Sequence, residues 1–504
     1  MARSARIAGV EVSLDHYIGG ARVGSADHFD DVSPIGEHVL GAVARGGERE
    51  ARLAVDAALE GFETWGNTPP AARAEVLHRI ADGVESRIEA LAAVETEDNG
   101  ALLRSHLRGV MPRVAHNFRF FADWLLGLHH DDFETRGHRN HVSWDPAGVA
   151  VLITPWNAPL MLATWKVAPA LAAGDAVVLK PAEWSPMTAS LLADITKEAG
   201  LPPGAFNVVQ GVGEEAGDAL VSDPRVARIG FTGSVPTARV IASRAAANLT
   251  PVSFELGGKS PFVVLEDADM DLALDLAVEQ YDNAGQVCLA GTRLLVDAKV
   301  VDEFTARFVE RVSSLRQGDP RDPGTDIGPQ ITRAHLERID GFVRRALAEG
   351  AEVRCGGGPN PDLGGLYYLP TLLSGVKEGS EILTEEVFGP VLTIQSFADE
   401  EEAVAMANST RFGLAATLVT SDETRAARLA SKVVAGTVWV NCFYVRDLRA
   451  PFGGSRESGI GREGGNWSFD FYCDVKNSVF APNLTSPTSP TSPTSPTKGE
   501  ETVP

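Results

Sequence analysis

Cysteine is scarce in this sequence of 504 residues, which contains only Cys288, Cys355, Cys442 and Cys473. Four scattered cysteines exclude a disulfide framework, and their spacing fits no zinc site. Such cysteine usage is typical of the reducing cytoplasm, where we expect the protein to be located.

A long uninterrupted apolar run is also missing. The first twenty residues carry charged side chains such as Glu11 where a signal peptide needs an apolar stretch. The most apolar region, residues 148–179, is interrupted by Asn157, Lys166 and Asp175. It therefore predicts buried strands and a helix, and we expect neither a secreted protein nor a membrane span.

Basic side chains are in deficit as well. The sequence has 45 lysines and arginines against 68 aspartates and glutamates, a formal net charge of −23. This charge repels nucleic-acid phosphates and anionic membranes, so we expect neither as a partner, although local basic pockets for small anions remain compatible with it. The 44% hydrophobic and 22% charged residues are close to the globular average, and the length predicts roughly two to four domains.

The pattern along the chain predicts an α/β fold. Helical spacing of apolar residues covers residues 50–107 and 110–126, and from residue 149 short apolar strands alternate with helices, as in a parallel sheet. The predicted strands of this first unit are 149–153, 176–179, 206–209, 228–231 and 252–255. Those of a second α/β unit are 261–265, 293–296, 392–397, 415–419 and 437–440. In contrast, residues 485–497 repeat Thr-Ser-Pro without apolar side chains, which predicts disorder.

Polar and glycine-rich motifs follow several of these strands, where ligands bind in such sheets. In chain order they are 153–157 (Ile-Thr-Pro-Trp-Asn), 180–183 (Lys-Pro-Ala-Glu), 230–234 (Gly-Phe-Thr-Gly-Ser), 254–259 (Phe-Glu-Leu-Gly-Gly-Lys), 285–288 (Gly-Gln-Val-Cys), 385–390 (Glu-Glu-Val-Phe-Gly-Pro) and 451–454 (Pro-Phe-Gly-Gly). Each motif alone is weak, but seven in this order leave little room for coincidence.

This ordered set resembles the aldehyde dehydrogenase superfamily over about residues 15–480. The resemblance implies a Rossmann-type NAD-binding domain, an α/β catalytic domain and a small β extension for oligomerisation, in a homodimer or homotetramer that acts on a small-molecule aldehyde. The implied limits are 1–123 with 147–256 for NAD binding, 257–453 for catalysis, 124–146 with 466–482 for oligomerisation, and 483–504 for the disordered tail.

Three residues form the catalytic group that the resemblance implies. Cys288 would be the nucleophile, although a lone intracellular cysteine is also often a buried apolar residue. Glu255 would be the base that activates water, or else an ion-paired structural group. Asn157, with the backbone N–H of Cys288, would stabilise the oxyanion, but an asparagine there could also cap a helix. Lys166 and Glu463 could form a proton relay or a structural ion pair.

The resemblance also implies NAD at the strand ends. Lys180 and Glu183 would hold the adenosine ribose, and Glu183 would repel a 2′-phosphate, which favours NAD over NADP. The alternative for this pair is a surface ion pair. Gly233 and Ser234 would direct a helix N-terminus at the pyrophosphate, with Ala238 where the family commonly has glycine.

A second glycine pattern competes for this role. Residues 211–216 (Gly-Val-Gly-Glu-Glu-Ala) match G-x-G-x-x-[GA], but two glutamates are electrostatically poor neighbours for a pyrophosphate. Glu386 and Phe388 resemble the pair that contacts the nicotinamide ribose. The implied cofactor-binding residues are Ile153, Thr154, Pro155, Trp156, Lys180, Ala182, Glu183, Gly213, Phe231, Gly233, Ser234, Leu256, Glu386 and Phe388.

Two other stretches narrow the choice of aldehyde. Residues 111–118 and 441–449 resemble the branch that oxidises 2-hydroxymuconic and 5-carboxymethyl-2-hydroxymuconic semialdehydes from the meta-cleavage of aromatic rings. In that branch two arginines hold the substrate carboxylate, and Arg113 and Arg446 match them. These arginines could instead form interface or structural salt bridges.

Rival functions remain at this point. A general aliphatic or aromatic aldehyde dehydrogenase would share the catalytic group, a CoA-acylating dehydrogenase lacks a base at the position of Glu255, and a thiol acyltransferase would bind no nicotinamide. A non-catalytic protein could retain the fold, but the complete Cys288, Glu255 and Asn157 set argues against it.

Four histidines invite a metal interpretation. Their spacing fits no standard metal site and acidic and basic residues surround them, so we expect no metal. These histidines are His129, His130, His138 and His141.

Overall fold

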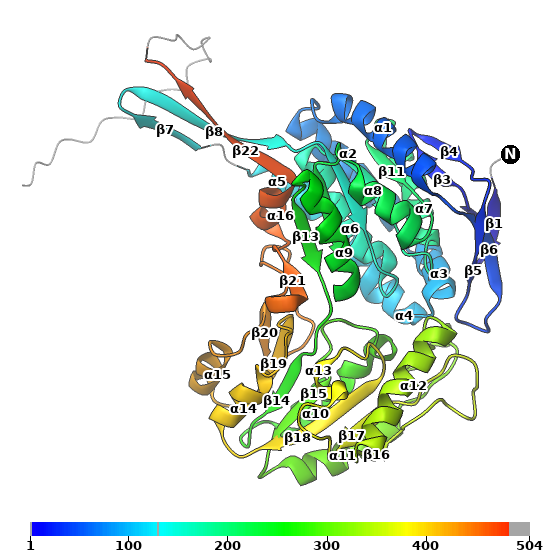
Figure 1. Ribbon diagram of the computed structural model, residues 1–504, viewed down its shortest axis with the longest axis vertical. Helices are drawn as coiled ribbons and strands as arrows, with labels where there is room; N and C mark the ends of the chain where they lie inside the picture. The colour runs from blue at the N-terminus through cyan, green and yellow to red at the C-terminus, as the bar shows by residue number, and fades with distance from the viewer. Residues whose placement is uncertain (1–2, 129–130, 483–504) are drawn as a thin grey trace, which may run out of the picture.

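The computed structural model describes residues 3–128 and 131–482, and Figure 1 shows two large bodies of sheet and helix with a thin β arm that extends away from them. No helix of these described residues is long and apolar enough to cross a membrane. The predicted disordered tail, residues 483–504, lies outside the described residues, as do His129 and His130.

The first large sheet has eight strands in the order β21-β13-β12-β9-β10-β11-β3-β4. The five central strands, from β13 to β11, are parallel, whereas β21, β3 and β4 pair antiparallel at the edges. Their bounds are β3 (His16–Ile18), β4 (Ala21–Val23), β9 (Val149–Ile153), β10 (Ala176–Lys180), β11 (Phe206–Val208), β12 (Arg228–Thr232), β13 (Val252–Glu255) and β21 (Gly459–Ile460). The five parallel strands were predicted, but the edge strands of two or three residues were missed because they are too short to show a period.

Helices cover both faces of this sheet, so its central strands are apolar throughout. Ala150 and Leu152 of β9 belong to one core and Val149 and Val151 to the other, as alternation along a strand requires. The first core receives α2 (Pro70–Glu85), α5 (Met111–Leu126), α6 (Pro159–Ala173) and α7 (Met187–Glu198), and the second receives α1 (Glu48–Trp65), α8 (Asp218–Ser222) and α9 (Val235–Asn248).

The predicted helical stretch 50–107 is not one element. It comprises α1, α2, α3 (Ile88–Asn99) and the short α4 (Leu103–Ser105), and it continues into a π-helical turn, η1 (His106–Val110), before α5 begins. Such turns often lie at functional sites, and η1 faces the larger of the two cavities described below.

The second large sheet has seven strands in the order β16-β17-β18-β15-β14-β19-β20, parallel except for the edge strand β16. Its strands are β14 (Pro261–Val264), β15 (Arg293–Asp297), β16 (Glu352–Cys355), β17 (Thr371–Ser374), β18 (Val391–Phe397), β19 (Ala415–Val419) and β20 (Thr437–Val440). The helices around it are α10 (Met270–Val278), α11 (Val301–Ser313), α12 (Arg333–Ala348), α13 (Glu381–Thr384), α14 (Glu400–Ala407) and α15 (Glu423–Ala430). All five predicted strands are present, and the α/β class is confirmed.

The arm is a three-stranded antiparallel sheet in the order β22-β8-β7, which joins two segments far apart in the chain (Figure 1). Its strands are β7 (Asp131–Thr135), β8 (His138–Pro146) and β22 (Cys473–Phe480), preceded by α16 (Gly465–Tyr472). Near the N-terminus the sequence prediction missed two further strand pairs, β1 (Ser4–Ile7) with β2 (Val10–Ser13) and β5 (His28–Val32) with β6 (Val39–Ala44).

Candidate active site

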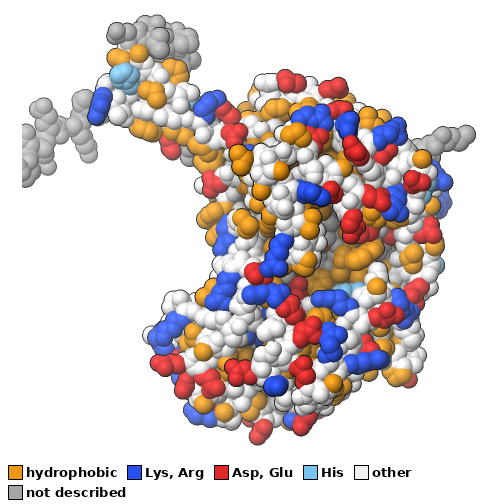
Figure 2. All heavy atoms as spheres, viewed as in Figure 1, with side chains coloured by type: hydrophobic (Ala, Val, Ile, Leu, Met, Phe, Trp, Pro, Cys, Tyr) orange, Lys and Arg blue, Asp and Glu red, His pale blue; other side chains and the backbone are white. Residues whose placement is uncertain are grey.

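The central strands of the first sheet bring three predicted motifs to one edge. β13, β12 and β9 are neighbours and parallel, so the segments that follow them lie side by side. Glu255 ends β13, Gly233 and Ser234 follow β12, and Asn157 follows β9. Figure 2 shows the surface hollowed between the upper and lower bodies, with hydrophobic side chains on its wall.

Cys288 comes from a strained loop after α10. The 3₁₀ segment η3 (Glu279–Gly285) ends with three consecutive residues of positive φ: Asn283 at 48°, Ala284 at 56° and Gly285 at 73°. Consecutive left-handed residues are rare because each costs an L-residue steric energy, and such strain persists only where surrounding contacts impose it. A Cβ atom on Gly285 would lie 2.2 Å from the backbone of Gly389, so this close approach requires glycine.

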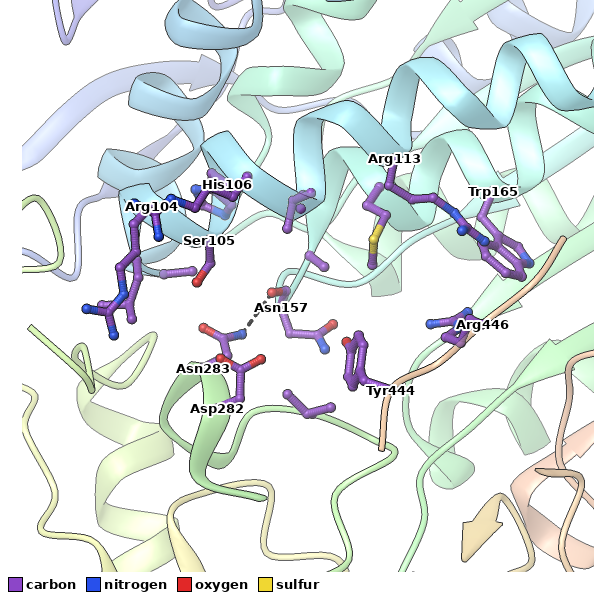
Figure 3. Close-up of a pocket in the computed structure, with 18 residues that line it drawn as sticks. Arg104, Ser105, His106, Arg113, Asn157, Trp165, Asp282, Asn283, Tyr444 and Arg446 are labelled. Atoms are coloured by element: carbon purple, nitrogen blue, oxygen red, sulfur yellow. Dashed lines mark hydrogen bonds between the residues drawn. The ribbon is translucent and has the colours of Figure 1, made fainter. Parts of the chain in front are cut away.

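Side-chain amides connect this loop to the residues that follow β9. The Asn157 amide donates to the carbonyl of Gln286 at 2.9 Å. The Asn283 amide donates to the carbonyl of Asn157 at 3.0 Å, the bond that is dashed in Figure 3. Gln286 in turn donates to the Asn283 carbonyl at 3.0 Å. The N-cap of α6 is Ala158, without a side-chain cap, so the Asn157 side chain binds the cysteine loop and does not cap this helix.

A cleft of about 440 Å³ brings the predicted catalytic group together. Asn157, Glu255 and Cys288 all line it, together with seven of the predicted cofactor residues. These seven are Pro155, Trp156, Gly233, Ser234, Leu256, Glu386 and Phe388. This arrangement places a thiol, a carboxyl and an amide donor beside one elongated site.

The electrostatics of Glu255 follow from its burial. Its carboxylate oxygens have no hydrogen-bond partner among the described residues, and burial raises its pKa, with Glu463 raising it further and Lys166 opposing this effect. Lys166 and Glu463 form a buried ion pair, and β21, between Glu463 and Phe452 in the chain, pairs with β13 at Glu255. A carboxylate with a raised pKa is a stronger base than an exposed one.

Cys288 is half-buried and sits in a turn closed by a hydrogen bond from the Ala290 N–H to the Val287 carbonyl, 3.1 Å. Burial, together with the charge of Glu386 and against that of Arg446, raises the pKa of its thiol to about 12. At neutral pH the thiol is therefore protonated, and it must lose a proton before it can act as a nucleophile.

Seven predicted cofactor residues do not line the 440 Å³ cleft but lie at or after the same strand ends. The Thr154 N–H donates to the carbonyl of Lys180 at 3.2 Å, and the Lys180 ammonium lies 3.2 Å from the Glu183 carboxylate. The seven are Ile153, Thr154, Lys180, Ala182, Glu183, Gly213 and Phe231. Gly213 opens a π-helical turn, η2 (Gly213–Gly217), after β11.

Two glycines of the cleft allow neighbouring side chains to approach the backbone closely. A Cβ atom on Gly257 would lie 2.1 Å from the Glu386 carboxylate, and one on Gly233 would lie 2.5 Å from the Phe231 ring. The Glu386 carboxylate accepts a hydrogen bond from the Gly258 N–H at 3.0 Å, which holds it beside the cleft. Ser234 caps α9, so a helix N-terminus opens on the same site.

A second cavity of about 590 Å³ contains both predicted substrate arginines, and Asn157 lines this cavity as well as the cleft. Arg113 projects from α5, and Arg446 lies in the loop after β20 (Figure 3). The Nε and Nη2 atoms of Arg113 and the Nε atom of Arg446 are buried and make no hydrogen bond to the described residues. No salt bridge is formed by either side chain within residues 3–128 and 131–482, so the structural salt bridges considered above are not seen.

The sequence analysis missed several residues that line the two cavities. Trp165 and Tyr444 line the arginine cavity, and His335 and Arg338 of α12 line the cleft. Trp165 directly precedes Lys166 on an apolar helix, which could have drawn attention to it. The α12 residues lie on a helix of the second α/β unit and follow none of the predicted motifs, so no local sequence pattern indicated a role for them.

Comparisons with known proteins agree with this geometry. Residues 22–478 match the family model described as the aldehyde dehydrogenase family. The chain is 44% identical over 475 residues to a 2-aminomuconic semialdehyde dehydrogenase of Danio rerio, across 92% of this chain and 97% of that protein. It is 43% identical over 480 residues to a 2-hydroxymuconic semialdehyde dehydrogenase of Pseudomonas sp. (strain CF600), across 92% and 98%. An indole-3-acetaldehyde dehydrogenase solved with NAD+ superimposes with a TM-score of 0.92 at 35% identity, across 94% and 97%.

Proposed function

This chain belongs to the aldehyde dehydrogenase family, and from this premise we propose that it oxidises a carboxylated, hydroxymuconate-type semialdehyde to its acid with NAD. It is thus an oxidoreductase that acts on aldehydes. The observation that carries the proposal is that two cavities meet at Asn157. One holds Cys288 and Glu255, and the other holds the unpaired Arg113 and Arg446.

Cys288 would attack the aldehyde carbon as a thiolate and form a thiohemiacetal. The oxyanion would accept hydrogen bonds from the Cys288 backbone N–H and from the Asn157 amide. The Asn157 amide donates one of its two hydrogens to the Gln286 carbonyl, and the other would be donated to the oxyanion. When bound, NAD supplies the hydride acceptor. Loss of hydride from the thiohemiacetal carbon leaves a thioester on Cys288.

Glu255 would complete the reaction by accepting a proton from water, which attacks the thioester and releases the acid and the Cys288 thiolate. Its burial and raised pKa suit this role, because a base with an ordinary carboxylate pKa would hold the proton weakly. The buried Lys166–Glu463 pair stands next to this base. Its part as a proton relay or as a structural pair stays open.

For NAD we propose the fourteen residues predicted above, seven from the cleft and seven from the adjoining strand ends. Glu386 and Phe388 would contact the nicotinamide ribose, and Lys180 and Glu183 the adenosine ribose. The Glu183 carboxylate would accept hydrogen bonds from ribose hydroxyls and repel a 2′-phosphate, so we propose NAD over NADP.

For the substrate we propose that Arg113 and Arg446 bind a carboxylate. Unpaired buried guanidinium groups are costly unless an anion binds them, and a carboxylate matches their planar donor geometry. The relatives of Danio rerio and Pseudomonas are named for muconic semialdehydes, which carry such a group. The alternative is a neutral aldehyde, as in the name of the solved indole-3-acetaldehyde dehydrogenase.

The test follows NADH absorbance with purified protein, 2-hydroxymuconate semialdehyde and hexanal, with NAD or NADP and without CoA. We expect NADH formation without CoA, faster with NAD, and a kcat/KM higher for the carboxylated aldehyde. Arg446→Ala should raise KM selectively for that aldehyde. An equal effect of Arg446→Ala on hexanal would contradict the carboxylate site, and no NADH with either aldehyde would point to a non-catalytic protein.

We also propose that the arm assembles the chain into a homodimer or homotetramer in the cytoplasm. Phe133, Val475 and Val479 of the arm strands are 51%, 55% and 57% exposed, which is unusual for large apolar side chains on paired strands. Light scattering of the intact protein would test this, since a monomer would contradict it. The four free cysteines support a reducing compartment.

A further inference from the structure

Arg113 and Arg446 are two of the four arginines that line the substrate cavity, and neither forms a salt bridge among the described residues. The nearest carboxylate along the chain, Asp447, is bound instead by Arg449 at 2.6 Å. Asp282 also lines the cavity, but it forms no salt bridge with Arg113 or Arg446 among the described residues. Burial, with the charge of Arg446, lowers the pKa of Arg113 to about 10. Some other group must therefore hold these cations in place.

Aromatic rings are the groups that contact them. The Cζ atom of Arg446 lies 4.4 Å from the centre of the Trp165 ring and 4.1 Å from that of Phe452. The Cζ atom of Arg113 lies 5.1 Å from the Trp165 ring. Trp165 thus contacts both arginines, and Figure 3 shows all three side chains gathered at one end of the cavity, away from Arg104.

The two rings are themselves firmly held. Trp165 is 3% exposed on α6, and its ring meets that of Phe452 edge to face, with centres 5.7 Å apart and planes at 70°. The Phe452 N–H donates to the Glu463 carbonyl at 2.8 Å, and the Glu463 N–H donates back at 2.7 Å. The Phe452 backbone is therefore bound to Glu463, the residue that pairs with Lys166.

A ring face and a carboxylate stabilise a guanidinium in different ways. A carboxylate would accept its N–H groups and cancel its charge, whereas a ring attracts the cation through its face and leaves the N–H donors unoccupied. This difference matches the buried, unpartnered nitrogens of Arg113 and Arg446. No acceptor of the described residues therefore occupies these donors.

We infer that Trp165 and Phe452 are positioning residues that hold Arg113 and Arg446 as a preassembled, uncompensated cation pair for the substrate carboxylate. They thereby determine specificity for carboxylated aldehydes. This inference rests on the proposed function, because it presumes that the pair binds the substrate. It adds that selectivity depends on two apolar residues as well as on the charged ones.

The test compares KM and kcat for 2-hydroxymuconate semialdehyde and hexanal in Phe452→Leu and Trp165→Leu, which retain apolar bulk and lose the ring face. We expect KM for the carboxylated aldehyde to rise about tenfold, with KM for hexanal and both kcat values changed less than about twofold. Trp165→Phe retains a ring face and should lose less selectivity than Trp165→Leu. If Trp165→Leu does not fold, Trp165→Phe still tests the role of the ring.

Phe480→Leu is the matched control. Phe480 of the arm carries Arg139 over its ring at 4.3 Å, so the substitution removes the same kind of stack far from the cavity. It should leave the selectivity unchanged. A selectivity loss in Phe480→Leu equal to that of Phe452→Leu would overturn the inference.

The outcomes separate the inference from the function beneath it. If the wild-type protein does not prefer the carboxylated aldehyde, the proposed substrate class fails, and the inference fails with it. If the wild type prefers it and Arg446→Ala abolishes the preference while both leucine variants retain it, only the inference is overturned. An equal rise of KM for both aldehydes would show that the rings merely shape the cavity, which also overturns it.

Discussion

The two cavities that meet at Asn157 differ in how two of their arginines each are bonded. In the cleft, Arg338 donates to the carbonyls of Val387 and Glu386 at 2.6 and 2.7 Å, and Arg411 pairs with Glu385 at 2.7 Å. In the substrate cavity, Arg113 and Arg446 have buried nitrogens without partners. The side chains of Arg338 and Arg411 are thus bonded within the chain, whereas those of Arg113 and Arg446 are not.

This difference distinguishes features that serve many reactions from features that select one class of substrate. A nucleotide cleft built from backbone, glycines and neutralised charges can serve many reactions on the same fold, because it has to bind only the cofactor. A cavity with uncompensated positive charge favours an anionic substrate and disfavours neutral ones. We therefore expect the largest effects from changes to the chemistry that both cavities need, smaller effects from a change at their junction, and the smallest effect from a change at the cofactor side.

The largest effect should come from removing the thiol that both cavities need. Cys288→Ala should reduce kcat by about 10⁵-fold or more, because Cys288 supplies the only thiol among the described residues that line the cleft. Steady-state NADH formation with any aldehyde measures it. Cys442→Ala, a substitution at another half-buried cysteine, is the control and should retain activity. Substantial activity in Cys288→Ala would remove the proposed chemistry from this site.

A smaller but still large effect should follow from Glu255→Gln. The amide cannot accept a proton, so we expect steady-state turnover to fall by ~10²–10⁴-fold. A first-turnover burst of NADH should remain. Stopped-flow absorbance separates the two phases, and an unchanged steady-state rate would exclude Glu255 as the deacylating base.

The raised pKa of Glu255 predicts the direction in which kcat changes with pH. Burial raises the pKa of Glu255, so its carboxylate becomes protonated, and useless as a base, at a higher pH than an exposed glutamate would. In the wild type, kcat should therefore fall as the pH is lowered through this raised pKa. The acidic limb should disappear from the residual activity of Glu255→Gln. A wild-type rate independent of pH across the acidic range would contradict this assignment.

Strand order and motifs made the cleft largely predictable from sequence. β9, β12 and β13 are apolar runs that end in polar motifs, and parallel neighbours place those ends together. The roles assigned to the individual residues remain predictions. Asn283, in contrast, could not be predicted, because its role depends on a left-handed backbone and on a contact with a loop 126 residues away. Likewise, no local pattern could show that Trp165 and Phe452 meet around Arg446.

Asn283 offers a way to disturb the junction between the cavities. Asn283→Gly removes the hydrogen bond to the Asn157 carbonyl and tolerates the positive φ, so it separates the lost contact from backbone strain. We expect kcat to fall about tenfold, because the amide donor and the Cys288 loop lose their mutual alignment. KM for both aldehydes should change little. As a control, Asn408→Gly removes the side-chain bonds of a half-buried asparagine that lines neither cavity, to the Lys432 carbonyl at 2.9 Å and from the Val434 N–H at 2.8 Å, and it should leave kcat unchanged.

The smallest effect should come from Glu183, which follows β10 and lies outside the 440 Å³ cleft. The Lys180 ammonium is buried and pairs with Glu183, whose side chain is 28% exposed, so part of the charge of Glu183 is already neutralised. Glu183→Gln should therefore narrow the preference for NAD over NADP by only about threefold, mostly by improving KM for NADP. The ratio of kcat/KM for the two cofactors measures it, with 2-hydroxymuconate semialdehyde held saturating. Because Glu183 lines neither the cleft nor the arginine cavity, the preference for carboxylated aldehydes should not change. A simultaneous loss of that preference would mean that the two cavities are not independent, and the contrast between them would have to be abandoned.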